Sequence, residues 1–223
     1  MTKDTIYISP EFNPHTLQRD WGLFLQRNRP EIVEAASENL SSLRATLFQS
    51  VFGQIERVWP AKTQPSLPAV PPKVTTDNLP NQSDQLCRDV GFDITSLALL
   101  ADVPIHRPIH LTQNSLIGHW RWLREIWRGC ANRAPAAHVN PTGPSAPTPV
   151  TDALLSGKNN LAIAQLRSQF KQLEAAPWDV ALYHSFLANL TLFCPFIGTE
   201  LLWRQGLVER ELGNTSQTEG STE

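Results

Sequence analysis

The prolines limit the fold of this chain more than any other sequence feature. There are 18 of them in 223 residues, and most fall into two runs that also contain Thr, Ser and Asn. Proline removes a backbone donor and fixes φ, so such runs favour extended polyproline-like conformations and cannot build a core. The sequence therefore predicts linkers at 61–83 and 134–151, three helical segments at 1–60, 84–133 and 152–212, and a disordered tail at 213–223.

The apolar residues between these runs recur at spacings of three and four, the period of an amphipathic helix. Asn13 followed by Pro14 predicts one helix start, and Pro30 predicts another helix whose apolar stripe continues almost to Trp59. A stripe of that length needs a partner, which is either another helix of the chain or a second copy of it. After Asp84 the sequence predicts a helix, a break at Gly91 and a further helix from about Asp93. We therefore predict an all-α fold with several amphipathic helices in two or three clusters.

The C-terminal segment predicts further helices. Apolar residues between Ile163 and Leu173 are spaced like a short coiled-coil seam. The run 186–198 is the most apolar in the chain, but it is shorter than the ~20 residues that cross a bilayer. It predicts a buried helical hairpin, with a re-entrant or interfacial segment as the alternative, and Thr199 is the expected cap of a last helix.

The stretch 115–130 combines tryptophan with arginine. On a helix, its apolar residues would share one face and its arginines another, with Trp122 at the edge of the apolar face. The apolar residues are Leu116, Trp120, Leu123, Trp127 and Cys130, and the arginines are Arg121, Arg124 and Arg128.

Two functional interpretations and one structural interpretation fit this helix. Tryptophan and arginine are typical of hot spots in protein interfaces, and also of helices that lie on an anionic membrane surface. The alternative is a core helix with a solvated basic face. Nucleic acid is disfavoured because the chain has a net charge of -2 and a pI near 6.3. The predicted interaction surface is Trp120, Arg121, Trp122, Arg124, Trp127 and Arg128.

No catalytic, cofactor-binding or small-molecule motif is found in the sequence. His106 and His110 have the spacing of half a metal site on a helix, but Pro108 between them breaks helix geometry. Three widely spaced cysteines match neither a disulfide framework nor a zinc motif. The first residues lack an apolar signal core, which predicts a cytoplasmic location. We expect no enzyme activity, no cofactor and no metal.

Residues 106–128 are similar to a leader found in many bacterial proteins of the methyltransferase and glycosyltransferase kind. The shared elements are His106-Arg107-Pro108, then Leu116-Ile117-Gly118, then a basic helix containing tryptophan. In that family a Trp-Tyr pair and a Gln-Gln-Asn run usually follow, whereas this chain continues into a proline-rich run. The resemblance implies an accessory protein of surface-polysaccharide assembly rather than a transferase.

The leading functional hypothesis is a non-catalytic helical interaction protein, with a protein partner or a peripheral contact to an anionic membrane through residues 120–128. The alternative is an enzyme or enzyme-associated domain of glycan assembly. A third hypothesis is a scaffold that self-associates through the helix expected at 30–59.

Overall fold

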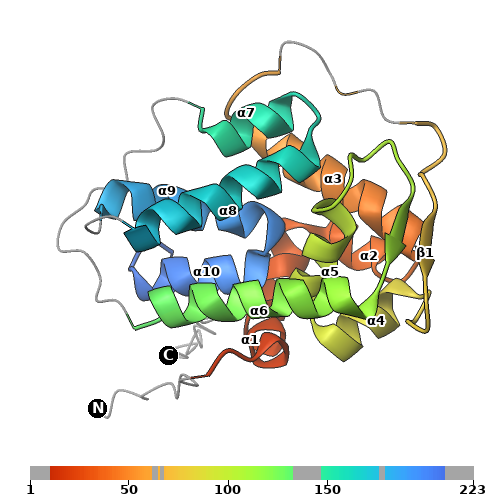
Figure 1. The fold of residues 1–223 in the computed structure, drawn as a ribbon, viewed down its shortest axis with the longest axis horizontal. Helices are drawn as coiled ribbons and strands as arrows, with labels where there is room; N and C mark the ends of the chain where they lie inside the picture. Colours follow the sequence, from red (N-terminus) through yellow and green to blue (C-terminus); the bar gives the residue numbers. More distant parts are fainter. Residues whose placement is uncertain (1–10, 62–64, 66–67, 133–146, 176–178, 209–223) are drawn as a thin grey trace, which may run out of the picture.

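A computed structural model describes residues 11–61, 65, 68–132, 147–175 and 179–208. Within these ranges the chain forms ten helices and one two-stranded sheet (Figure 1). The prediction of an all-α fold is confirmed, and the predicted tail at 213–223 lies outside the described residues. None of the described helices combines the length and the apolar content that crossing a bilayer requires.

The N-terminal segment contains three helices: α1 (Pro14–Asn28), α2 (Pro30–Ala35) and α3 (Leu40–Glu56). The predicted start of α1 is confirmed, because the Asn13 side chain accepts hydrogen bonds from the first-turn amides. The prediction of one long helix over 30–59 is wrong. The chain turns before Asn39, whose side chain accepts hydrogen bonds from Ser41 N and Ser42 N and so begins α3 as a separate helix.

The apolar stripe of α2 and α3 is buried in the core of the same chain. Ile32, Leu43 and Val51 are fully shielded from solvent, so the partner that this stripe requires is the rest of the fold. The self-association hypothesis thereby loses the long exposed stripe on which it depended.

Helices α4 (Ser83–Val90) and α5 (Phe92–Leu100) are separated at Gly91, as the sequence predicts. Gly91 has a φ of 93°, and a Cβ at this position would lie 2.7 Å from the Cβ of Pro14. Only glycine suits both the positive φ and this close approach. Every residue of α5 is buried, so this helix forms the centre of the core.

A small parallel sheet lies where the sequence pattern predicts no strand. Strand β1 (Val74–Thr76) pairs with β2 (Ile109–Leu111), with Val74 opposite Ile109. Strand β1 falls inside the stretch predicted to be a linker, and Val74 is buried. Three-residue strands are too short to show an alternating pattern, which explains why the sequence does not reveal them.

The remaining helices follow in chain order. They are α6 (Gln113–Cys130), α7 (Pro149–Leu155), α8 (Asn159–Ala175), α9 (Val180–Phe193) and α10 (Pro195–Arg204). The predicted hairpin is confirmed, since α9 and α10 pack against each other, but α10 begins at Pro195 rather than after Thr199. The seam of α8 is buried within the same chain, beside α7 and α9. Figure 1 shows α6 and α10 running along one another, with α8 and α9 above them.

Buried apolar side chains from all three helical segments form one cluster. Two polar side chains organise the loop between α5 and β2. The guanidinium of Arg44 donates to the carbonyls of Leu99, Val103, Pro104 and Arg107. The Asn159 amide donates to the carbonyls of Leu100 and Val103 and accepts from Ile105 N. These bonds fix the chain that leads into β2 and α6.

Candidate functional site

Helix α6 begins at a capping box formed by Thr112 and Ser115. The Thr112 hydroxyl accepts from Ser115 N, and the Ser115 hydroxyl accepts from Thr112 N. The buried side of α6 includes His119, Trp122 and Ile126. The buried face is thus turned from the predicted one, since Trp122 is buried and Trp120 is only half-buried.

Trp122 and Trp127 are core residues, with 8% and 4% of their surface exposed. The guanidinium of Arg167, from α8, lies 5.0 Å from the Trp122 ring centroid and donates to His119 Nδ1 at 3.0 Å. Burial, with a smaller contribution from Arg167, lowers the pKa of His119 to about 4, so the imidazole is neutral. The structure thus places these two indoles inside the fold and not at a surface.

Trp127 belongs to a network that joins three helices. The guanidinium of Arg204, from α10, lies 4.5 Å from the Trp127 ring centroid. Arg204 also forms a 2.8 Å ion pair with Glu200 and donates to the carbonyl of Ala131 at 2.9 Å. The second Glu200 oxygen accepts from Trp21 Nε1 of α1 at 2.8 Å. This network stabilises the packing of α1, α6 and α10.

The opposite side of α6 faces solvent. Arg121, Arg124 and Arg128, defined here as the basic face, are all exposed. Arg124 lies over the half-buried ring of Trp120, 5.2 Å from its centroid. Among the residues that the structure describes, no carboxylate forms an ion pair with these three arginines. Of the predicted interaction surface, Trp120 and the basic face are thus accessible.

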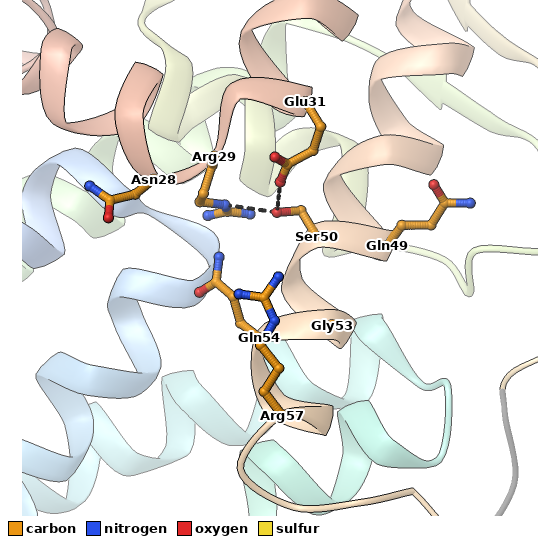
Figure 2. Close-up of a pocket in the computed structure, with 8 residues that line it drawn as sticks. All are labelled: Asn28, Arg29, Glu31, Gln49, Ser50, Gly53, Gln54 and Arg57. Atoms are coloured by element: carbon orange, nitrogen blue, oxygen red, sulfur yellow. Dashed lines mark hydrogen bonds between the residues drawn. The ribbon is translucent and has the colours of Figure 1, made fainter.

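A second candidate site is a cavity of about 250 Å³ between the start of α2 and α3. Figure 2 shows the guanidinium of Arg29 in the middle, Glu31 and Ser50 on one side, and Gln54 and Arg57 on the other. The cavity lining comprises Asn28, Arg29, Glu31, Gln49, Ser50, Gly53, Gln54 and Arg57.

Arg29 is 5% exposed. Its Nε donates to Ser50 Oγ at 3.0 Å and its Nη1 to the Leu192 carbonyl at 3.1 Å. Ser50 in turn donates to Glu31. Burial lowers the pKa of Arg29 to about 10, while nearby Glu31 and Asp93 oppose this shift, so the group remains a cation near neutral pH.

The carboxylate of Asp93, a residue of α5, lies beside the N-terminus of α10. It accepts hydrogen bonds from Phe196 N at 3.2 Å and from Ile197 N at 2.8 Å. Burial raises the pKa of Asp93 to about 7, although these two hydrogen bonds and the charge of Arg29 act in the opposite direction. Near neutral pH a substantial fraction of this carboxyl is therefore protonated.

Thr75, His110 and Asp77 form a short hydrogen-bonded chain at the sheet. His110 Nδ1 lies 2.8 Å from Thr75 Oγ1, and His110 Nε2 lies 2.9 Å from Asp77. The imidazole and the carboxylate are both largely exposed, so water competes for each of these bonds. The chain joins β1 to β2, and we assign it a structural role.

His106 and His110, which have the spacing of half a metal site on a helix, do not lie on a helix in the structure. His106 is exposed on its own, whereas His110 bonds to Asp77 and Thr75. Over the described part of the chain, no three His, Cys, Asp or Glu side chains are close enough to hold a metal ion.

Sequence reasoning missed Arg29, Arg44, Arg167 and Arg204. A partial signal exists for two of them. Arg44 is spaced four residues from Leu40 and from Phe48, and Arg167 is spaced four from Ile163 and three from Phe170. Arginines at these positions lie near an apolar face, so their charged ends need partners from elsewhere in the fold.

No protein-family model and no curated protein matches this chain. The functional argument therefore depends on the geometry of the two candidate sites.

Proposed function

We propose that this chain is a non-catalytic helical accessory protein that binds an acidic protein partner through the basic face of α6. The observation that carries the proposal is the row of Arg121, Arg124 and Arg128, exposed and without a carboxylate partner among the described residues. The non-catalytic part rests on the sequence, which contains no known catalytic motif.

The composition of the basic face favours a protein partner. Arginine presents several donors in a planar fork and binds carboxylates in two parallel hydrogen bonds. The ring of Trp120 beside Arg124 adds a half-buried aromatic surface of the kind found at hot spots. Exposed charges at the edge of a protein interface act mainly on the association rate and on the choice of partner. Binding through the basic face should therefore weaken as the salt concentration rises.

A peripheral membrane role is the less favoured form of the same idea. Helices that lie on bilayers place tryptophan and other apolar side chains between the lipid headgroups. Trp122 and Trp127 are buried in the core and cannot take this position without unfolding. Ile117 and Trp120 alone would supply the apolar contact. We propose a cytoplasmic location, in keeping with the three buried free cysteines.

The alternative proposal is an enzyme-associated domain of surface-polysaccharide assembly. It rests on the resemblance of 106–128 to a transferase leader, and on the exposed position of His106 and Arg107 immediately before β2 and α6. Transferase or exporter genes beside the gene for this chain would favour this alternative, and their absence would count against it.

The test is the binding of a labelled oligoglutamate peptide, measured by fluorescence anisotropy at about 50 mM and about 300 mM NaCl. We expect saturable binding that weakens with salt and is lost in the triple variant Arg121→Glu, Arg124→Glu, Arg128→Glu. The matched control reverses three exposed cations elsewhere, Arg27→Glu, Lys158→Glu and Lys171→Glu, and should retain most of the binding.

Flotation with phosphatidylserine-containing vesicles separates the two kinds of partner. Binding to vesicles that requires the three arginines, without peptide binding, would replace the protein partner by a membrane. Equal peptide binding by both triple variants would show that the basic face is only solvated, and the proposal would be rejected.

A further inference from the structure

The cavity at Arg29 contains a buried hydrogen-bond donor without a partner. Two of the three guanidinium nitrogens of Arg29 are used, by Ser50 and by the Leu192 carbonyl. The third, Nη2, is buried and has no hydrogen-bond partner in the described structure. A buried charged donor left unsatisfied is unfavourable, so this atom favours an acceptor from outside the chain.

The α3 side of the cavity presents one face of a helix. Four residues of α3 and its C-cap line this side, at successive spacings of three, one and three: Ser50, Gly53, Gln54 and Arg57. These spacings place them next to one another on the helix surface. A Cβ built at Gly53 would meet no atom within 4 Å. Gly53 therefore leaves open space at this wall, which a larger side chain would fill.

The charge of the cavity lining selects the ligand. Arg29 and Arg57 are cations and Glu31 is the only carboxylate in the lining, which leaves one net positive charge. Asp93 lies close enough to influence Arg29, but its pKa of about 7 makes it largely neutral at pH 6. A singly charged oxoanion therefore balances this site better than a dianion does.

We propose that this cavity binds a small monocarboxylate, held between the guanidinium groups of Arg29 and Arg57 with the Gln54 amide as a further donor. Arginine and carboxylate match in planar geometry and in charge. The site is separate from the basic face of α6, and the inference does not depend on the proposed protein partner.

Access to Nη2 requires a movement of side chains at the rim. Nη2 has almost no surface open to solvent, and Figure 2 shows the ends of Gln54 and Arg57 pointing toward Arg29. Neither of these two side chains makes a hydrogen bond or an ion pair with another described residue. Both are long side chains, so they can turn aside and then contact the ligand.

The experiment is a two-dimensional amide NMR titration of the full chain at pH 6 with acetate, lactate and sulfate, which is a dianion at this pH. We expect saturable shifts of the Gly53 and Gln54 amides with the monocarboxylates and none with sulfate. Arg57→Gln should weaken binding about fivefold, because Arg57 is exposed and its charge is partly screened. Arg27→Gln, an exposed cation outside the cavity, should bind as the wild type does.

Gly53→Leu is the decisive variant, because it fills the open space without removing any polar group. Leucine also favours helix over glycine, so the variant should unfold at the same or a higher urea concentration and yet bind no monocarboxylate. Absence of saturable shifts in the wild type, saturation by sulfate alone, or unchanged binding in Gly53→Leu would each overturn the assignment.

Discussion

Replacement of Arg44 by methionine should destabilise the whole protein. Arg44 is 1% exposed, and its guanidinium donates to four carbonyls, with distances of 2.8 Å to Leu99, 2.5 Å to Arg107, 3.2 Å to Val103 and 3.0 Å to Pro104. Methionine keeps the unbranched apolar stem and removes every donor. The carbonyls then lose the group that organises the loop from α5 to β2.

The size of the expected stability loss depends on whether each carbonyl can find a new hydrogen-bond donor after Arg44 is replaced. A hydrogen bond to a charged donor contributes about 1.5–3 kcal/mol. The Leu99 carbonyl belongs to a fully buried helix, whereas the other three lie in a loop with exposed residues and can turn toward water. Burial of the guanidinium is itself unfavourable and lowers the pKa of Arg44 to about 10. Removal of this buried charge therefore offsets part of the loss. We expect a net loss of about 3–5 kcal/mol.

Urea unfolding followed by tryptophan fluorescence measures this loss, and the melting temperature should fall by about 10 °C for a chain of this size. Arg44→Lys keeps the charge without the planar fork and should give an intermediate loss. The exposed Arg27→Met is the control and should stay within about 0.5 kcal/mol of the wild type. A loss below about 1 kcal/mol in Arg44→Met would refute the reasoning.

Three further predictions concern the core. The pKa of Asp93 is raised in the folded state, so this group should make the free energy of unfolding rise as pH falls from 7 toward 4, by up to about 1.4 kcal/mol per pH unit. In urea unfolding between pH 4 and 8, the Asp93→Asn variant should lack this dependence. His119 has a lowered pKa, so its contribution should make stability fall as pH falls from 6.5 toward 4, and His119→Gln should abolish that slope in the same titration. Gly198→Ala should destabilise the protein by about 1–3 kcal/mol in thermal unfolding, because a Cβ there would lie 2.6 Å from Thr191 Cα; an unchanged melting temperature would contradict the close packing of α9 and α10.

The features that the sequence predicts correctly are local. The start of α1 depends on Asn13 and Pro14, and the break between α4 and α5 depends on Gly91. The hairpin at the C-terminus follows from an apolar run too short to span a bilayer and interrupted by Pro195. Each of these signals acts within a few residues, so no knowledge of the tertiary fold is needed to recognise it.

The features that the sequence does not predict depend on distant partners. Arg44 and Asn159 bind carbonyls more than 50 positions away along the chain. The break after α2 arises because the Asn39 side chain caps α3, and an asparagine inside an apolar stripe is a weak sign of a helix boundary. The monocarboxylate cavity combines Arg29 with residues of α3, and no local pattern indicates that contact.

The buried face of α6 was difficult to identify from the sequence because it contains a polar residue, His119. The observed buried positions fit a regular helical stripe if His119 is counted with the apolar residues. Hydrophobicity alone favours the neighbouring stripe through Trp120. His119 is acceptable in the core because Arg167, 48 residues away, donates to its Nδ1. The two-sided character of α6 and the place of Trp127 on its apolar face were therefore predictable, but the burial of Trp122 instead of Trp120 was not.

The central claim is that α6 buries Trp122 in the core and offers its arginines to a partner. The most direct test is the free energy of unfolding in urea of Trp122→Ala, beside that of the triple variant Arg121→Glu, Arg124→Glu, Arg128→Glu. We predict that Trp122→Ala loses about 3–5 kcal/mol, as expected for a buried tryptophan, and that the triple variant stays within about 1 kcal/mol of the wild type. A Trp122→Ala protein as stable as the wild type, or a triple variant that unfolds as readily as Trp122→Ala is predicted to, would contradict this division of the helix.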